Sequence, residues 1–474
     1  MNSYLFYDIE TTGFNKAYDQ VVQFAAIRTD TRFNEIERHN ILVKLRPDVV
    51  ISPQAMITHR IPIAKLGSGM SEYESIFRIH RMMNAPGTIS LGYNSLGFDD
   101  EFLRFSFYRN LFKPYTHQYN KGCFRMDLLP MAAVFRVFKP DVLKWPEAGG
   151  RPSLKLELIN AANNLVKGRS HDALVDVEVC VALAKVFYRE KKMWDYLTES
   201  FDKRIDQDRI FQLPHSFDSI FGPHSKALIV DSMFGPDDSY QAVGLSIGNS
   251  EAYKNQSLYL RVDLPELIET RQDSIDNTTR IIRRKYGEPR FILPPKPRFY
   301  NRISARRRET VKNNIDFLLK NPIVFHEIIK YHRQYKYPFI PNLDIDAALY
   351  QNGFPSHRDT KTCERFNNAD LPEKIEMISL FKNPGYKNLA RRVLWRNYSD
   401  RLDAELMDDL HRHMKKVNPD SLDKAMLDYM GKPRFTPEEA ISVIKRIKEE
   451  DEPDSEQITL LDELDEYLHD HFIL

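Results

Sequence analysis

The sequence predicts an α/β protein in which a mixed sheet flanked by helices comes first, a small β-containing region follows, and a helical region comes last. Three observations favour this class. Strand-like runs alternate with segments of helical period up to residue 190, short strands divided by turn residues follow, and capped amphipathic helices occupy the last part. We expect three domains, at residues 1–190, 191–342 and 343–474.

Composition limits the class of protein further. The 474 residues are 42% hydrophobic and 28% charged, as in a globular protein. The net charge of +1 means that any surface for a polyanion must be local. Cys123, Cys180 and Cys363 are too few and too scattered for a disulfide framework or a zinc site. Because a signal-peptide pattern and a long apolar run are also lacking, we expect a cytoplasmic protein that has no contact with a membrane.

The first predicted element is a strand at residues 4–7 that ends in Thr-Thr-Gly turn chemistry. Asp8 and Glu10 are therefore expected where a sheet edge opens into a loop, and on one face because they are two residues apart. Carboxylates so close repel each other, and a bound cation or a shared proton makes the pair tolerable. The pair alone is equally typical of a solvated strand end, so it does not decide the function.

The next predicted elements complete the first half of a sheet. Strands at Val21–Thr29 and at residues 41–45 predict an antiparallel meander with the first strand. Ile76 and Met83 then face inward on a helix that leads to a strand at Thr88–Gly92. Two later helices are predicted at residues 128–138 and 153–162.

Asp99 is predicted at the start of a helix, just beyond the strand that ends at Gly92. Phe98, Phe102 and Phe105 recur there at helical spacing. Asp99 is thus a third acid at a strand-to-helix edge. It is also typical of an ordinary helix acid favoured by the helix dipole.

A packed helix is predicted to begin near residue 173. Its apolar stripe has the helical period and consists of Ala173, Val177, Cys180, Ala184 and Phe187. This stripe puts Asp176 on the helix and His171 on the loop that enters it. A lone histidine at a helix entrance is more often an ordinary surface residue than a base.

Together, these residues resemble the three Exo motifs of the DEDDh-type 3′→5′ exonucleases. The motifs are Asp8-x-Glu10 after the first strand, Asp99 in Gly-Tyr-Asn-x-x-x-Phe-Asp-Asp, and His171 five residues before Asp176. Within that superfamily the chain looks like bacterial exonuclease I. The stretches that carry this similarity are residues 23–30, 91–94 and 107–110, with weaker ones at 233–235, 262–264 and 346–350. Ile9 and Thr12 depart from the pattern, because exonuclease I often has aromatic residues there.

The resemblance implies a fold and a reaction. The fold would be an RNase H-like exonuclease domain, an SH3-like β-containing domain and a helical C-terminal domain. The reaction would be 3′→5′ degradation of single-stranded DNA to 5′-mononucleotides, in DNA repair and recombination. The helical domain would help to enclose the strand. The family also binds the acidic C-terminal tail of single-stranded-DNA-binding protein, and we expect this partner and a monomeric chain.

The resemblance also implies a site that holds two Mg²⁺ ions, with Mn²⁺ as a substitute. Asp8 would be the bridging ligand, Glu10, Asp99 and Asp176 would complete the site, and His171 would take a proton from the attacking water. The residue types suit this chemistry, because carboxylate oxygens are the ligands that Mg²⁺ prefers and two such ions can activate a water and stabilise a leaving oxygen. Two neighbouring acids, Asp100 and Asp172, are expected to be surface acids or to support the site.

The expected substrate-binding residues are Glu10, Thr11, Arg104, Tyr115, Tyr119 and Lys155. Lys155 falls where the family usually has a basic residue near the scissile phosphate. Bases and aromatic residues interleave along Arg104, Tyr108, Arg109, Tyr115, His117, Tyr119, Lys121 and Arg125, as in a path for a single strand. A polar helix face followed by a loop would have the same composition.

The rest of the chain gives weaker signals. Short strands are predicted at residues 227–230, 241–247 and 258–262. The basic blocks at 283–285 and 306–308 are typical of solvated helix faces, and a phosphate-contacting surface is the second interpretation. In the helical region, Asp370 begins one helix, and Thr436 and Glu439 are expected at the N-cap and N3 positions of another.

Two other functions stay open at this point. The first is the same chemistry on RNA 3′ ends or in proofreading, because the motifs act on the phosphate and not on the sugar. The second is a single-strand-binding scaffold with an inactive site. The presence of all five catalytic positions speaks against this scaffold.

Overall fold

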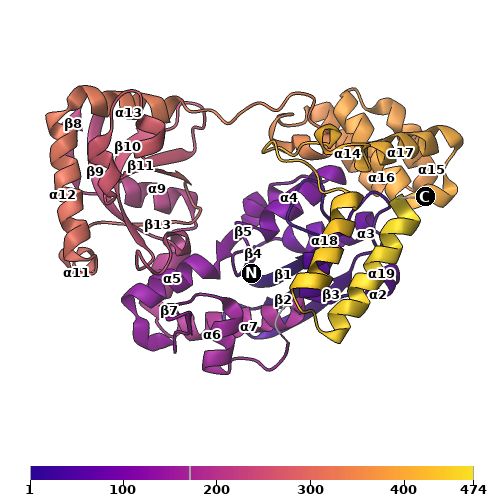
Figure 1. Cartoon of the computed structure of the whole chain (residues 1–474), viewed down its shortest axis with the longest axis horizontal. Coiled ribbons are helices and arrows are strands. Elements are labelled where there is room, and N and C mark those ends of the chain that lie inside the picture. Colours follow the sequence, from indigo (N-terminus) through magenta and orange to yellow (C-terminus); the bar gives the residue numbers. More distant parts are fainter. Residues whose placement is uncertain (1, 170–171, 473–474) are drawn as a thin grey trace. The chain divides into compact units, whose positions relative to one another are not determined.

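The computed structural model describes residues 2–169 and 172–472, and Figure 1 shows its elements. The chain packs as two compact units. The first unit comprises Met1–Arg125, Gly168–Glu178 and Pro338–Leu474, and the second comprises Met126–Lys167 and Val179–Tyr337. Because these units follow packing rather than chain order, the three predicted domain boundaries stay a prediction.

The first unit is built on a five-stranded mixed sheet in the order β3-β2-β1-β4-β5. Its strands are β1 (Ser3–Thr11), β2 (Val21–Thr29), β3 (Glu35–Leu42), β4 (Thr88–Gly92) and β5 (Phe124–Asp127). β1 pairs antiparallel with β2 and parallel with β4, and β2 is buried along its whole length. Aromatic and aliphatic residues such as Leu5 and Phe6 are fully buried on β1, which explains why this stretch forms a central strand.

Two predicted strands differ from the observed ones. β1 runs on to Thr11 because its pairing with β2 continues at Asp8↔Ala25 and Glu10↔Gln23. Asp8 and Glu10 therefore lie on the strand itself and not where it opens into a loop. The strand predicted at residues 41–45 is observed at Glu35–Leu42, where mostly exposed polar residues form a sheet edge that hydrophobicity does not reveal.

Helices pack with this sheet, and further helices make up most of the C-terminal region. Those that follow the early strands are α1 (Pro53–His59), α2 (Ile63–Gly67), α3 (Glu72–Met83) and α4 (Asp99–Arg109). Those near the C-terminus are α14 (His357–Asn368), α15 (Leu371–Met377), α16 (Pro384–Tyr398), α17 (Ala404–Val417), α18 (Pro437–Glu450) and α19 (Ser455–Phe472). One hydrophobic core joins β1, α3 and α4 to α14 and α16, so both regions fold as one unit.

The capping predictions for the C-terminal helices are confirmed. The Asp370 side chain accepts a hydrogen bond from the Glu373 backbone N–H at the start of α15. Thr436 and Glu439 form a complete capping box on α18. On the last helix, α19, the side chains of Leu461, Leu464 and Leu468 are fully buried.

The second unit combines helices with an antiparallel sheet. Its strands are β6 (Glu147–Ala148), β7 (Arg151–Pro152), β8 (His215–Ser219), β9 (Gly222–Val230), β10 (Gln241–Asn249), β11 (Gln256–Arg261), β12 (Ile281–Lys285) and β13 (Phe291–Leu293). Its helices are α5 (Leu128–Phe138), α6 (Leu156–Asn163), α7 (Ala173–Tyr188, whose first turns belong to the other unit), α8 (Lys191–Glu199), α9 (Lys203–Phe211), α10 (Ile275–Thr278), α11 (Pro297–Tyr300), α12 (Ala305–Lys320) and α13 (Pro322–Gln334). The larger sheet has the order β12-β11-β10-β9-β13, with β8 paired to β9. The predicted α/β class, with a mixed sheet, an antiparallel sheet and a helical C-terminal region, is confirmed.

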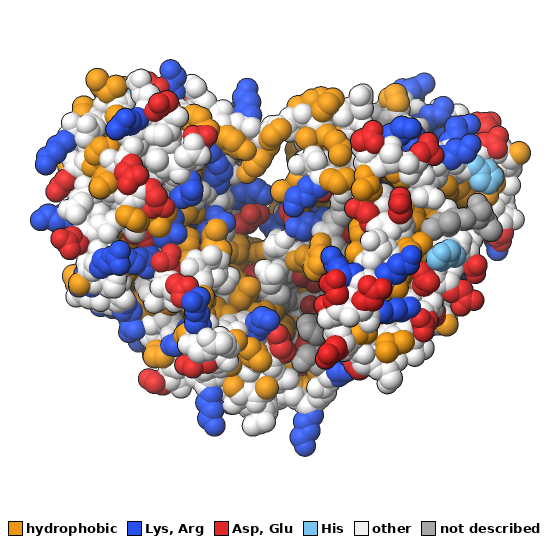
Figure 2. Space-filling view, viewed as in Figure 1, with side chains coloured by type: hydrophobic (Ala, Val, Ile, Leu, Met, Phe, Trp, Pro, Cys, Tyr) orange, Lys and Arg blue, Asp and Glu red, His pale blue; other side chains and the backbone are white. Residues whose placement is uncertain are grey.

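The surface reflects the balanced charge of the sequence. On the face shown in Figure 2, basic and acidic side chains are interspersed. Among the described residues, the helices lack the length and apolar composition that crossing a membrane requires.

Candidate active site

Four acids of the first unit interact electrostatically with one another. Asp8 and Glu10 lie on β1, Asp99 is the first residue of α4, and Asp176 lies in the first turn of α7. Asp8 and Glu10 share a strand face because they are two residues apart. The Ile9 backbone N–H donates a hydrogen bond of 3.1 Å to Asp99, which ties the start of α4 to β1. We call Asp8, Glu10, Asp99 and Asp176 the acid cluster.

The carboxylates of the acid cluster are at least partly buried and repel one another. Burial raises the pKa of Asp8 well above its usual range, and the neighbouring charges of Asp99, Glu10 and Asp176 raise it further. Burial likewise raises the pKa of Glu10 to about 8, with further contributions from Asp176 and Asp99. The folded protein therefore resists holding these carboxylates ionised together unless protons or cations offset their charge.

The donor set of the cluster fits divalent cations. It consists of carboxylate oxygens, which suit hard cations such as Mg²⁺ and Mn²⁺ better than soft metals. Four carboxylates also match the charge of two such ions. The predicted metal ligands are thus brought together by the fold, and their role as ligands is a proposal.

Asp100, next to Asp99, has a different role. It is completely buried and accepts hydrogen bonds from Arg104 at 2.8 Å and Arg125 at 2.6 Å, with the His117 ring at 2.7 Å. Burial by itself would raise the pKa of Asp100, but these arginines outweigh it and hold the pKa well below its usual range. The expectation of a surface acid is therefore wrong, while that of a supporting acid fits this position at the start of α4.

Asp172 is the exposed neighbour of the fourth acid. Its carboxylate accepts a hydrogen bond of 3.1 Å from the Leu174 backbone N–H, so it caps the helix that carries Asp176. His171, the predicted proton acceptor, lies outside the described residues.

The predicted substrate-binding residues occupy several environments. Thr11 is buried at the end of β1, and its hydroxyl donates to the Gly13 carbonyl at 2.8 Å. Arg104 is only 3% exposed and is paired with Asp100 and Glu101. Lys155 is an exposed residue of the second unit at the start of α6. Direct substrate contact by these side chains stays a prediction.

Tyr115 and Tyr119 fit a contact surface better. Both line a pocket of about 830 Å³ in the first unit, together with Tyr350 and Phe354. Tyr119 is 70% exposed, and the Tyr115 ring lies 5.6 Å from the Arg104 guanidinium carbon.

Some of the other basic and aromatic residues between Arg104 and Arg125 have structural roles. Arg109 is fully buried and donates hydrogen bonds to the Ala17 and Asp19 carbonyls and to Glu72. His117 is fully buried against Asp100. The single-strand path is therefore wrong for these two residues, because their partners come from distant segments that a local pattern does not contain.

The basic blocks of the second unit also differ from expectation. Residues 283–285 lie on strand β12 and not on a helix face, and Arg284 is buried in a bidentate ion pair with Asp206 at 2.6 Å. Residues 306–308 do lie on a helix, α12, and Arg307 pairs with Asp263. Each block thus contributes at least one structural arginine.

Two residues near the acid cluster, Phe14 and Lys16, were not predicted from the sequence. Phe14 is 80% exposed, although its ring contacts Phe98, the residue before Asp99, at 6.1 Å between centroids. Lys16 donates a hydrogen bond of 2.9 Å to the Gly97 carbonyl in the turn before α4. Phe14 could have been found from the sequence, because it is an aromatic residue directly after the Asp-x-Glu-Thr-Thr-Gly motif.

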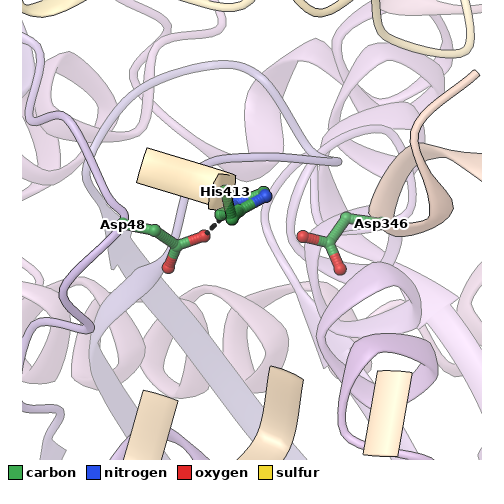
Figure 3. Close-up of side chains that lie close together, drawn as sticks. All are labelled: Asp48, Asp346 and His413. Atoms are coloured by element: carbon green, nitrogen blue, oxygen red, sulfur yellow. Dashed lines mark hydrogen bonds and ion pairs between the residues drawn. The ribbon is translucent and has the colours of Figure 1, made fainter. Parts of the chain in front are cut away.

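A second acid and histidine group lies elsewhere in the first unit. Figure 3 shows Asp48, Asp346 and His413 close together, with the His413 ring 3.0 Å from Asp48. Arg396 bonds to both carboxylates, at 2.7 Å for Asp48. Because arginine already neutralises these acids, the group is a buried ion-pair network and not a cation site.

Comparisons with known proteins place the chain among the nucleases. A family model described as Exonuclease matches residues 5–184, and one described as Exonuclease I C-terminal domain matches residues 343–471. The chain belongs to the exonuclease I family.

Individual relatives align over most of the chain. Exodeoxyribonuclease I of Escherichia coli (strain K12) is 29% identical over 433 residues, which are 88% of this chain and 90% of that protein. Exodeoxyribonuclease I of Haemophilus influenzae is 35% identical over 222 residues, 45% of this chain and 47% of that protein.

Solved structures share the fold. E. coli exonuclease I in complex with a dA16 oligonucleotide superposes with a TM-score of 0.84 at 25% identity, over 99% of this chain and 100% of that chain. A structure described as SSB/Exonuclease I in complex with an inhibitor has a TM-score of 0.80 at 23% identity, over the same shares, and shows the fold alone.

Proposed function

We propose that this protein is a 3′→5′ exodeoxyribonuclease that degrades single-stranded DNA to 5′-mononucleotides with two divalent cations. The convergence of four mutually repelling carboxylates in the acid cluster carries this proposal. The DNA substrate is supported by the E. coli relative, which is named an exodeoxyribonuclease and whose solved structure holds a dA16 oligonucleotide.

Asp8, Glu10, Asp99 and Asp176 of the acid cluster would hold the cations in this proposal. When bound, the cations supply an activated water and stabilise charge on the phosphoryl and leaving oxygens. Asp100 fixes the first turn of α4, and the Ile9 N–H holds the Asp99 carboxylate in place, so the oxygens are positioned before substrate arrives. His171 takes the proton of the attacking water, since an ordinary histidine pKa near ~6.5 suits a base at neutral pH.

A substrate panel tests the reaction. We expect mononucleotide release from the 3′ end of labelled single-stranded DNA with Mg²⁺, and no release from a matched duplex. EDTA and Asp176→Asn should each abolish cleavage, while Asp400→Asn, which changes an exposed acid of the same unit, should retain it. Equal or faster cleavage of a matched RNA would contradict the DNA substrate, and cleavage of none of these substrates would favour the scaffold.

Phe14 is expected to help seat the substrate. An exposed aromatic ring beside a nuclease site can stack on a base, which contributes about 1–3 kcal/mol. Phe14→Ala should therefore raise KM at least about fivefold with a smaller change in kcat. Phe14→Tyr keeps the ring and should restore KM. Steady-state kinetics on a labelled oligonucleotide check this, and an unchanged KM for Phe14→Ala would remove the ring from the substrate site.

The remaining predictions concern context. The tail of single-stranded-DNA-binding protein stays a predicted partner, at a position that we do not assign. A monomeric state, a cytoplasmic location and a role in DNA repair stay predictions.

A further inference from the structure

Lys16 lies in the loop between β1 and β2, shortly after the exposed ring of Phe14. Its ammonium nitrogen donates a hydrogen bond of 2.9 Å to the carbonyl of Gly97, which comes two residues before Asp99. The carboxylates of Glu101 and Asp99 act on Lys16 electrostatically and favour its charged form. The loop therefore brings a cation to the edge of the acid cluster.

The contacts of its neighbours hold this loop in place. The Asn15 backbone N–H donates a hydrogen bond of 2.7 Å to the buried carboxylate of Asp19. The Asn15 side chain donates a hydrogen bond of 3.3 Å to Asp428 and accepts one of 3.1 Å from the Ala17 backbone N–H. Because the loop is ordered by these bonds, a ligand that meets Lys16 has little backbone to order when it binds.

The positive charge of Lys16 is available to a ligand. Its ammonium donates to a neutral carbonyl and not to a carboxylate. An ammonium has three N–H donors, so it can bind a further acceptor beside Gly97. By contrast, Arg104 and Arg125 near the start of α4 are paired with the buried carboxylate of Asp100. Lys16 is also partly exposed, so an acceptor can reach it from solvent.

An aromatic ring accompanies this cation. Phe14 is 80% exposed, and its ring contacts that of Phe98, the residue that follows Gly97. Phe14 and Lys16 therefore both reach the turn that precedes Asp99. A ring beside a basic side chain suits a nucleotide, whose base stacks on the ring and whose phosphate pairs with the cation.

We propose that Lys16 binds a phosphate near the 3′ end of the DNA strand, as a further substrate-binding residue. A lysine ammonium binds phosphate as a point charge, and here it offsets part of the repulsion between the strand and the acid cluster. This inference rests on the proposed function, since it adds a residue to the same site.

Binding by the full chain in EDTA, which stops metal-dependent hydrolysis, tests the contact. The probes are fluorescein-labelled oligothymidylates, each with one uncharged methylphosphonate linkage, placed at successive linkages from the 3′ end or near the 5′ end. The Kd of each probe is divided by the Kd of the unmodified oligonucleotide. Lys16→Gln should lower this ratio at least about threefold at a linkage near the 3′ end, because both changes remove the same ion pair. Near the 5′ end the ratio should stay as in the wild type.

The salt dependence of binding gives an independent readout. Lys16→Gln should reduce the slope of log Kd against log salt concentration by about 0.7, the value for one phosphate contact on a single strand. Lys16→Arg keeps the charge and should restore both the ratio and the slope. Lys415→Gln, which neutralises an exposed lysine of α17 in the same unit, is the matched control and should change neither.

A purely structural role of Lys16 would give another result. If Lys16 only ties the loop to Gly97, Lys16→Gln weakens the binding of all probes equally, and a ratio that is unchanged at every linkage overturns the proposal. Because these assays need no cleavage, the two proposals can fail separately. A lowered ratio without any nuclease activity would support Lys16 and reject the reaction, whereas cleavage with an unchanged ratio would reject Lys16 alone.

Discussion

Asp8→Asn is expected to lower the rate of DNA cleavage at least about a hundredfold, the scale on which loss of one stabilising group at a reaction centre lowers turnover. The same change should raise the thermal midpoint of the metal-free protein. Burial raises the pKa of Asp8 well above its usual range, and Asp99, Glu10 and Asp176 raise it further, so an uncharged amide removes a repulsion that the fold otherwise sustains. Loss of activity with gain of stability is the signature of a site selected for ion binding.

The measurement is a thermal melt in EDTA and in excess Mg²⁺, beside a cleavage assay. Wild-type protein should gain stability from Mg²⁺ through binding to the folded state, and Asp8→Asn should gain less. Asp100→Asn is the contrasting control. Its buried carboxylate is neutralised by Arg104 and Arg125, so the amide should lower the midpoint in both buffers. A full Mg²⁺ shift in Asp8→Asn would show that Asp8 is not a ligand.

The local pattern of the acids could be predicted because short-range geometry determines it. Two residues along a strand always share a face, and an acid before a helical stripe always falls near the helix start. The structure accordingly places Asp8 and Glu10 on β1 and Asp99 at the first residue of α4. That these acids act together could be inferred only from the resemblance to a family.

Long-range pairing limited the prediction of the substrate path. Arg109 and His117 have the composition of a nucleic-acid surface, yet their partners are Glu72 and Asp100, and nothing near them in the sequence indicates these pairs. Composition thus identifies candidates, and burial decides among them.

The C-terminal region depends on a buried ion-pair network, and Arg396→Met is expected to destabilise the first unit by about 3–5 kcal/mol. Arg396 forms a bidentate pair with Asp48, at 3.2 and 2.7 Å, and also bonds to Asp346. Figure 3 shows how these two acids approach each other with His413. Removal of the arginine leaves the carboxylates buried without enough positive charge to neutralise them. This lowers the free energy of unfolding far more than the loss of an exposed ion pair does.

The pH dependence of stability distinguishes uncompensated carboxylate charge from simple loss of packing. Burial alone would raise the pKa of Asp48, but Arg396 and Arg46 outweigh it and hold the pKa well below its usual range. In the wild type this stabilisation is present above the unfolded pKa of about 3.9 and is lost as the pH falls through the lower folded value. In Arg396→Met the acids take up protons more readily, so the deficit relative to wild type should shrink between pH 7 and pH 5.

Urea denaturation at both pH values measures this deficit. Arg401→Met is the matched control, because Arg401 pairs with Asp400 at 3.7 Å while both side chains are well exposed, and it should leave stability unchanged. A deficit for Arg396→Met that is the same at pH 7 and pH 5 would assign the effect to packing. A deficit that falls with pH would show that uncompensated charge on Asp48 and Asp346 is what the arginine prevents, and hence that electrostatics as well as apolar packing hold the helical region to the sheet.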